Sequence, residues 1–274
     1  MRLTVTFFLV LFSIQYGRSQ IGENYALKQR YNLEIIQIEE FIDRFNFEQN
    51  TKFDLYLRNN YPDVRLDREQ MIRILFDQYD SYLDTEMMRK FISFVNDSTD
   101  PKYLHFYDSQ WYAEAYCIFE NKERDVSVKL YLKNQSQADS SSKWVIAGVS
   151  SELFEYPGSY DTSRYLSPVS HGTDFIGLYN ALKDRKNLLN YFVRDFEADP
   201  MTYFILLLQR NELNLKLIKK VRYHFLTIPG WVFTVDYFNR KIGATGWLIS
   251  GLSKASNDEK EIYKRDILHL YFLR

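Results

Sequence analysis

The sequence is poor in the residues on which several common kinds of site depend. Its 274 residues include one cysteine, ten glycines and six prolines. A single thiol cannot form an internal disulfide, and so few glycines argue against glycine-rich phosphate loops. CxxC, HExxH and GxSxG motifs are also missing. With 35 basic and 36 acidic residues, the net charge of −1 provides no positive field for nucleic acid. We therefore expect no cofactor, no metal and no nucleic-acid partner.

Long apolar runs are missing too, except at the N-terminus. Residues 3–12 form an apolar run after Arg2, and small residues precede a cut site before Gln20. This three-part pattern is typical of a secretory signal peptide. No later stretch reaches the roughly 18 apolar residues that suggest a membrane span. We expect residues 1–19 to be removed and the remaining chain to be exported, periplasmic or extracellular, without an integral membrane segment.

The rest of the sequence is rich enough in apolar residues, at 46%, to bury a core. Its first half changes from helical to strand periodicity. Helices are expected over residues 31–45, 67–75 and 85–95, and strands over residues 111–119, 126–132 and 143–150. Asp67 and Gln70 form a capping-box-like pair at the start of the second helix. Polar residues 121–125 predict the turn of an antiparallel hairpin.

The same order of elements returns after residues 155–173, a stretch rich in Tyr, Ser, Pro and Gly that is typical of a linker. Helices are expected over residues 175–182, over residues 187–192 and from Asp199 onward, and strands over residues 220–228, 231–238 and 246–253. Asp199 can cap its helix, with Pro200 at the first helical position. For residues 259–274, strand and helix both remain open.

The repeated order indicates an internal duplication. Residues 143–150 (KWVIAGVS) align with residues 246–253 (GWLISGLS), and the preceding strands match in the same inside–outside phase. We therefore predict an α+β fold made of two tandem copies, each with N-terminal helices packed on a curved antiparallel sheet. The copies cover residues 20–154 and 174–274, and residues 155–173 join them. Trp144 and Trp247 hold matched positions, which predicts that they are equivalent core residues.

This unit, with helices first and a late strand that carries tryptophan, resembles the nuclear transport factor 2-like (cystatin-like) fold. The resemblance covers most of residues 22–152 and 174–274. It implies a sheet folded into a half-cone around a pocket, which some members use for catalysis and many use only for protein contacts. Enzymes of that superfamily place an Asp or His inside the cone as a general base. The resemblance makes Glu114, His224 and Asp236 candidate site residues.

The four histidines, His105, His171, His224 and His269, have no second His or Cys at metal-ligand spacing. His171 lies between Ser170 and Asp174, but neighbours on one short loop rarely have the geometry of a catalytic triad. We keep it only as a candidate ligand-binding residue. Cys117 falls on an apolar strand face, and we expect a buried, inert thiol.

These patterns leave three hypotheses about function open. The first is an exported, non-catalytic binding or assembly module of the cell envelope, for a protein or small ligand. The second is a pocket enzyme of the lyase or hydratase type that uses a carboxylate or a histidine. The third is a carbohydrate- or lipid-binding accessory protein. An enzyme requires a charged group deep in a pocket, and a sugar-binding protein requires exposed aromatic side chains.

Overall fold

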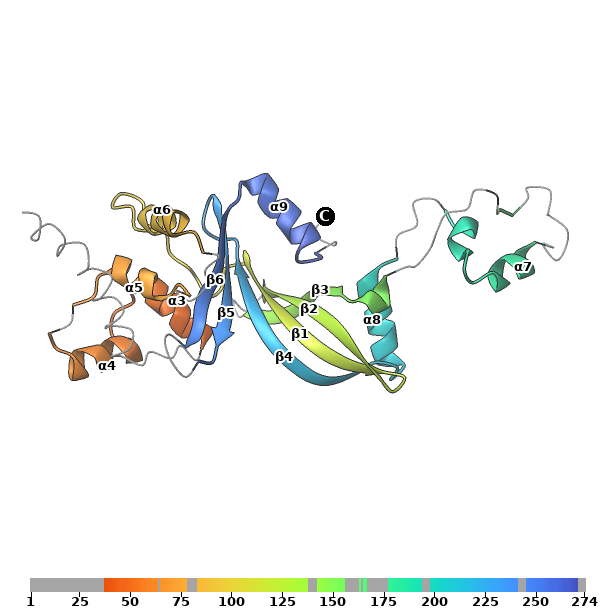
Figure 1. Cartoon of the computed structure of the whole chain (residues 1–274), viewed down its shortest axis with the longest axis horizontal. Coiled ribbons are helices and arrows are strands. Elements are labelled where there is room, and N and C mark those ends of the chain that lie inside the picture. Colours follow the sequence, from red (N-terminus) through yellow and green to blue (C-terminus); the bar gives the residue numbers. More distant parts are fainter. Residues whose placement is uncertain are drawn as a thin grey trace, which may run out of the picture. The chain divides into compact units, whose positions relative to one another are not determined.

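The structure, a computed structural model, describes residues 37–63, 65–77, 83–137, 142–155, 163, 165–166, 177–193, 198–240 and 245–270 (Figure 1). The chain divides into two compact units. The first unit is assigned Met1–Ala115, Leu130–Ala147 and Lys219–Arg274, and the second is assigned Tyr116–Lys129 and Gly148–Ile218. The predicted signal peptide lies outside the described residues, as does most of the predicted linker.

Six strands form one curved antiparallel sheet in the order β3-β2-β1-β4-β5-β6. They are β1 (Trp111–Asn121), β2 (Arg124–Ser136), β3 (Ser142–Ser150), β4 (Asn214–Phe225), β5 (Trp231–Phe238) and β6 (Gly246–Lys254). Together with the helices, this sheet confirms the α+β class. All six strands lie where the sequence pattern predicts strands, although β4 begins at Asn214 rather than at residue 220.

Local geometry fits the turns and the register of the sheet. Lys122 and Glu123 connect β1 to β2 with φ of 50° and 66°, as a two-residue hairpin turn with left-handed residues requires. β4 pairs with β5 through the register Arg222↔Asp236 to Phe225↔Phe233. β5 continues antiparallel to β6, with one irregularity between Thr234 and Val235. A bulge of this kind bends a strand locally and re-aims its side chains.

Four helices precede the sheet in the described part of the first unit. They are α3 (Ile38–Asn46), α4 (Lys52–Asn60), α5 (Arg68–Ile74) and α6 (Thr85–Val95). The predicted capping box of α5 is present, with both Asp67 and Gln70 hydrogen-bonded to the backbone. The helix α4 was not predicted, because its exposed Leu55 and Tyr56 lie between the buried Phe53 and Leu57, so its apolar residues do not follow one side of a helix. Arg68 ties three segments together by donating to the carbonyl oxygens of Phe45, Val95 and Lys102.

The main core of the first unit joins these N-terminal helices to the C-terminal strands. Phe45 of α3 and Phe91 of α6 both contact the ring of Phe233 on β5, with ring centroids 6.1 and 5.6 Å apart. Phe225 of β4 stacks on Phe233 and on Trp111 of β1. The helices that precede β1 therefore pack largely against β4, β5 and β6.

The second unit has its own helices: η1 (Glu152–Phe154), α7 (Leu178–Lys183), η2 (Leu188–Tyr191) and α8 (Pro200–Gln209). Asp199 caps α8 with Pro200 at its start, which confirms that prediction. Phe204 of α8 packs edge-on against Phe119 of β1 and Phe154 of η1. Asn121 joins these elements further by donating to the carbonyl of Glu212, at 2.9 Å.

The C-terminal segment forms helix α9 (Asn257–Asp266), which settles the open choice in favour of a helix for most of its described part. Ser256 and Glu259 make a capping box at its start. The buried Lys260 ammonium donates to the carbonyls of Leu226, at 2.5 Å, and Ile228, at 2.7 Å. These two bonds hold α9 to the connection between β4 and β5.

The prediction that Trp144 and Trp247 are core residues is wrong for Trp144, which is 38% exposed on β3, while Trp247 on β6 is half-buried. β3 and β6 are the two outer strands in the sheet order, and Phe76 also forms a parallel bridge to Ile249 of β6. The rings nevertheless reach one aromatic cluster, because both contact Tyr223. In the part of the chain that the structure describes, none of the helices has the length and apolar character needed to cross a membrane.

Candidate functional site

Two of the four predicted site residues meet in the structure. Glu114 of β1 and His224 of β4 lie on neighbouring strands, with the carboxylate Oε2 3.1 Å from the imidazole Nε2. The other ring nitrogen, Nδ1, lies 2.8 Å from the hydroxyl of Tyr263 on α9. Both Glu114 and His224 are buried. The sheet and α9 thus enclose a chain of three polar groups, Glu114–His224–Tyr263, which we call the histidine relay.

The chemistry of the histidine relay follows from its donors and acceptors. An ionised carboxylate only accepts hydrogen bonds, so Nε2–H of His224 donates to Glu114. In the neutral imidazole, Nδ1 is then an acceptor for the Tyr263 O–H. Each polar group has a partner, as burial requires. The geometry therefore fastens α9 to the sheet through the Tyr263 hydroxyl.

Asp236, the third candidate, is engaged elsewhere on β5. Arg222 donates to its carboxylate through Nε at 3.0 Å and through Nη2 at 2.8 Å, and the Ser250 hydroxyl donates at 2.6 Å. A bidentate arginine and a hydroxyl make strong, charge-assisted hydrogen bonds that fix the carboxylate in place. This arrangement fits a structural ion pair between β4, β5 and β6 better than a general base.

The remaining candidates give no catalytic arrangement. His171 lies outside the described residues. Burial raises the pKa of the Cys117 thiol on β1, which keeps it protonated and unreactive at neutral pH. Among the described residues, no group of three or more His, Cys, Asp or Glu side chains is placed to hold a metal ion.

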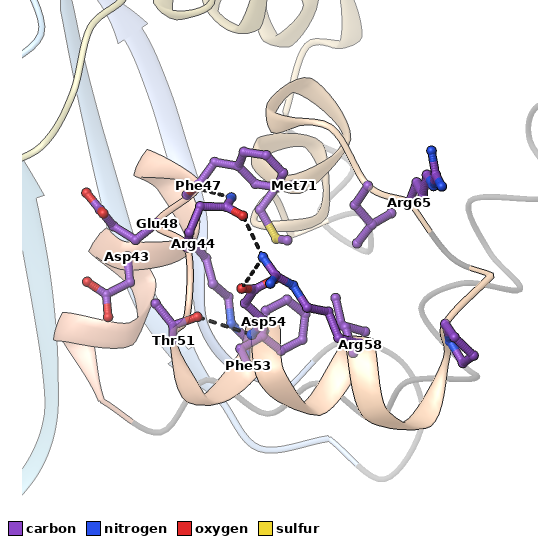
Figure 2. A pocket seen from close by; sticks show the side chains of 14 residues that line it. Asp43, Arg44, Phe47, Glu48, Thr51, Phe53, Asp54, Arg58, Arg65 and Met71 are labelled. Atoms are coloured by element: carbon purple, nitrogen blue, oxygen red, sulfur yellow. Dashed lines mark hydrogen bonds and ion pairs between the residues drawn. The ribbon is translucent and has the colours of Figure 1, made fainter.

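A cavity of about 450 Å³ opens elsewhere in the first unit, between α3, α4 and α5 (Figure 2). We call it the helical pocket. Its apolar wall includes Phe47, Phe53, Leu57, Leu66 and Met71, and its polar lining includes Asp43, Arg44, Glu48, Gln49, Thr51, Asp54, Arg58 and Arg65. The volume lies within the range of small-molecule sites, and six of the fourteen lining residues are charged, which favours a polar or charged ligand.

Arg44 is the most unusual residue of the helical pocket, because only 5% of it is exposed. One guanidinium nitrogen, Nη2, is paired with Glu40, and the guanidinium carbon lies 3.9 Å from the centre of the Phe53 ring. The other two nitrogens, Nε and Nη1, are buried and have no hydrogen-bond acceptor among the residues that the structure describes. Burial lowers the pKa of Arg44, although the Glu40 carboxylate opposes that shift.

The other charged residues of the helical pocket fall into two groups. Arg58 donates to Asp54 at 3.0 Å and to Gln49 at 2.8 Å, so this arginine is already engaged at the pocket wall. Asp43 carries a raised pKa because it is partly buried and because Glu48, Glu40 and Glu39 add negative charge around it. In Figure 2, the side chains of Asp43 and Glu48 lie close together at one side of the pocket.

Sequence reasoning missed both Arg44 and Tyr263. Arg44 was detectable in principle, because it follows Phe41 by three positions and precedes buried Phe45, which places a charge beside the apolar stripe of α3. Tyr263 gave no comparable signal, because its segment was open between strand and helix. Its link to His224 depends on the docking of α9.

A second cavity, of about 360 Å³, lies in the second unit and is lined by Leu153, Phe154, Glu155, Ala198, Asp199, Pro200 and Tyr203. Neither this cavity nor the helical pocket is lined by Glu114, His224 or Asp236. Comparison with protein families, with curated proteins and with solved structures finds no match to this chain.

Proposed function

We propose that the protein is an exported, non-catalytic binding or assembly module that holds a protein partner against an apolar surface of the second unit. Export is supported by the pattern of residues 1–19. Binding is supported by one observation: large apolar side chains are exposed on two consecutive elements. This α8–β4 surface consists of Tyr203, Ile205, Leu206 and Leu208 of α8 and Leu215 and Leu217 of β4, while the exposed Ile218 points to the opposite face of the strand.

The helix α8 contributes most of the exposed apolar side chains of this surface. Seven of its residues, Met201 and residues 203–208, are large and apolar, yet within it only Phe204 and Leu207 are buried. A helix that is apolar on all sides is usually enclosed by protein. Burying the exposed side of α8 against a partner would contribute about 1.5–3 kcal/mol for each side chain that becomes fully buried.

The first half of β4 contributes the remaining exposed apolar side chains of this surface. The pairing of β4 with β5 covers Arg222 to Phe225, whereas β4 itself begins at Asn214. Leu217 is 54% exposed, and Leu215 is exposed to a similar degree. Contiguous exposed apolar side chains on a folded protein mark interaction sites. The side chains of the surface are mostly aliphatic, which favours a protein partner over stacking on sugar rings.

The enzyme hypothesis has less support. Glu114 and His224 are buried within the histidine relay, and Asp236 is held by Arg222 and Ser250. A general base needs access to its substrate within hydrogen-bond distance. None of these three residues lines either of the two cavities described above.

The test uses the protein recovered from the exported fraction, whose first residue is expected at Gln20 by N-terminal sequencing. A photo-crosslinking amino acid at Leu206 should attach to a protein partner, which is then purified and its affinity measured. Leu217→Glu should weaken that affinity at least tenfold, because it places a charge in an apolar interface. Leu55→Glu, at an exposed leucine of α4, is the matched control and should bind within about threefold of the natural protein. Crosslinks to lipid alone, or equal binding by both variants, would contradict the proposal.

The two tandem copies are also a proposal. The order β3-β2-β1-β4-β5-β6 is the one obtained when two three-strand meanders join at their first strands, which supports a duplication. The buried Phe91 and Phe204 hold matched positions on α6 and α8. The duplication predicts single-copy relatives that form the same sheet as homodimers, which a structure of one would check. The boundaries 20–154 and 174–274 and the resemblance to nuclear transport factor 2-like domains stay predictions.

A further inference from the structure

We propose that the helical pocket binds a small zwitterion with an apolar side chain, namely an apolar α-amino acid, with its carboxylate at Arg44 and its ammonium group at Asp43 and Glu48. This site is separate from the α8–β4 surface, and the two proposals do not depend on each other. The carboxylate end follows from Arg44. Its Nε and Nη1 carry hydrogen-bond donors with no acceptor in the described part of the chain, although the residue is almost wholly buried.

Such an arrangement is unfavourable without a ligand. A buried donor without an acceptor costs about 1–3 kcal/mol, and more when the group is charged. Glu40 balances the charge but occupies only Nη2. A carboxylate oxygen at Nη1 would provide a strong, charge-assisted hydrogen bond, because both partners are ionised. No described side chain of the protein accepts from Nε or Nη1 of Arg44, so these two donors are available to a carboxylate from a ligand.

The ammonium end follows from the acidic side of the pocket. Asp43 and Glu48 both line the cavity. After burial, the negative charge of Glu48 is the largest cause of the raised pKa of Asp43. A cation between two carboxylates lowers the electrostatic repulsion between them. Leu57, Leu66 and Met71 then provide the apolar wall for a hydrocarbon side chain.

Entry of the ligand requires α4 to move. No solvent reaches Nε or Nη1 of Arg44, because the guanidinium group is covered by Phe53 of α4. The segment that leads into α4 contains two non-glycine residues with left-handed backbone, Phe47 (φ 60°) and Asn50 (φ 61°). Such residues store strain and occur at hinges and ligand clamps. A small core of Phe53, Leu57 and Met71 holds α4 in place, so its displacement would disturb few contacts.

The test measures binding of L-leucine, 4-methylpentanoate and 3-methylbutylamine by calorimetry and by thermal unfolding. The two analogues keep the hydrocarbon chain of leucine but lack its ammonium or its carboxylate group. We expect L-leucine to bind and to raise the unfolding temperature, and each analogue to bind at least tenfold more weakly. Failure of L-leucine to bind, or equal binding of either analogue, would overturn the proposal.

Variants assign the site. Arg44→Met should abolish leucine binding while the unliganded protein stays at least as stable, because the substitution removes a buried charge with two unpaired nitrogens. Arg89→Met is the matched control, since Arg89 of α6 is exposed and does not line the helical pocket, and it should bind leucine within about threefold of the natural protein. If Arg44→Met does not fold, Asp43→Asn provides the second variant and should weaken leucine but not 4-methylpentanoate. Unchanged leucine binding by Arg44→Met or Asp43→Asn would refute the assignment.

Discussion

Replacing Trp111 by alanine should lower the free energy of unfolding by about 3–5 kcal/mol, the usual cost of truncating a buried tryptophan. The indole is fully buried, stacks on Phe225 with ring centroids 5.3 Å apart, and donates from Nε1 to the carbonyl of Phe106 at 3.0 Å. Truncation would leave a cavity where α-helices and strands meet and would remove one donor to the Phe106 carbonyl, which Asn134 also reaches at 3.1 Å. Urea denaturation measured by circular dichroism checks the value.

Trp144→Ala is the matched control for this prediction. Trp144 contacts Trp111 edge-on, at 4.8 Å between ring centroids, but it lies exposed on an outer strand. Its truncation removes less buried area, so it should cost no more than about half as much as truncation of Trp111. Equal losses for the two variants would show that the core does not centre on Trp111.

Raising the pH from 10 to 12 should destabilise the protein by about 2 kcal/mol for each of two tyrosines, the buried Tyr112 and the partly buried Tyr223. Burial raises the pKa of both to about 12, with smaller contributions from nearby carboxylates. A raised pKa means that the folded state favours the neutral phenol. The stabilisation is therefore complete below pH 10, the value of an unfolded tyrosine, and is lost as the pH rises through the folded value.

Absorbance titration of phenolate checks this prediction. Two tyrosines should ionise near pH 12 in the folded protein and near pH 10 in concentrated urea. Tyr112→Phe and Tyr223→Phe remove one ionising hydroxyl each, so each variant should lose less stability than the natural protein between pH 10 and pH 12. An unchanged loss in both variants would mean that other groups cause the alkaline unfolding.

The order of helices and strands could be predicted from the sequence because local signals agree with the fold. The alternation of Val128 and Leu130 with polar residues marks β2, and the caps at Asp67 and Asp199 mark helix starts that the structure confirms. By contrast, α4 has only Phe53 and Leu57 as its buried anchors. Leu55 and Tyr56 of the same helix are exposed, so its apolar residues show no one-sided helical period.

The candidate site was less predictable, because it depends on which segments meet in space. Glu114 and His224 were recognised as charged residues on strands, but their pairing requires β1 and β4 to be neighbours across 110 residues. The helical pocket depends on Arg44 lacking acceptors among the described residues, and a sequence cannot show an absent partner. Trp144 was misjudged because a matched motif indicates an equivalent position in the sheet but says nothing about edge exposure.

The packing of the N-terminal helices on the C-terminal strands has a consequence for how the chain matures. During synthesis, Phe45 and Phe91 emerge more than 130 residues before their partner Phe233. Contacts so distant along the chain form late and slow the folding of a domain. The early helices must therefore stay without their final core until nearly the whole polypeptide has been made. A chain whose core cannot close early remains exposed to aggregation until β5 has been synthesised.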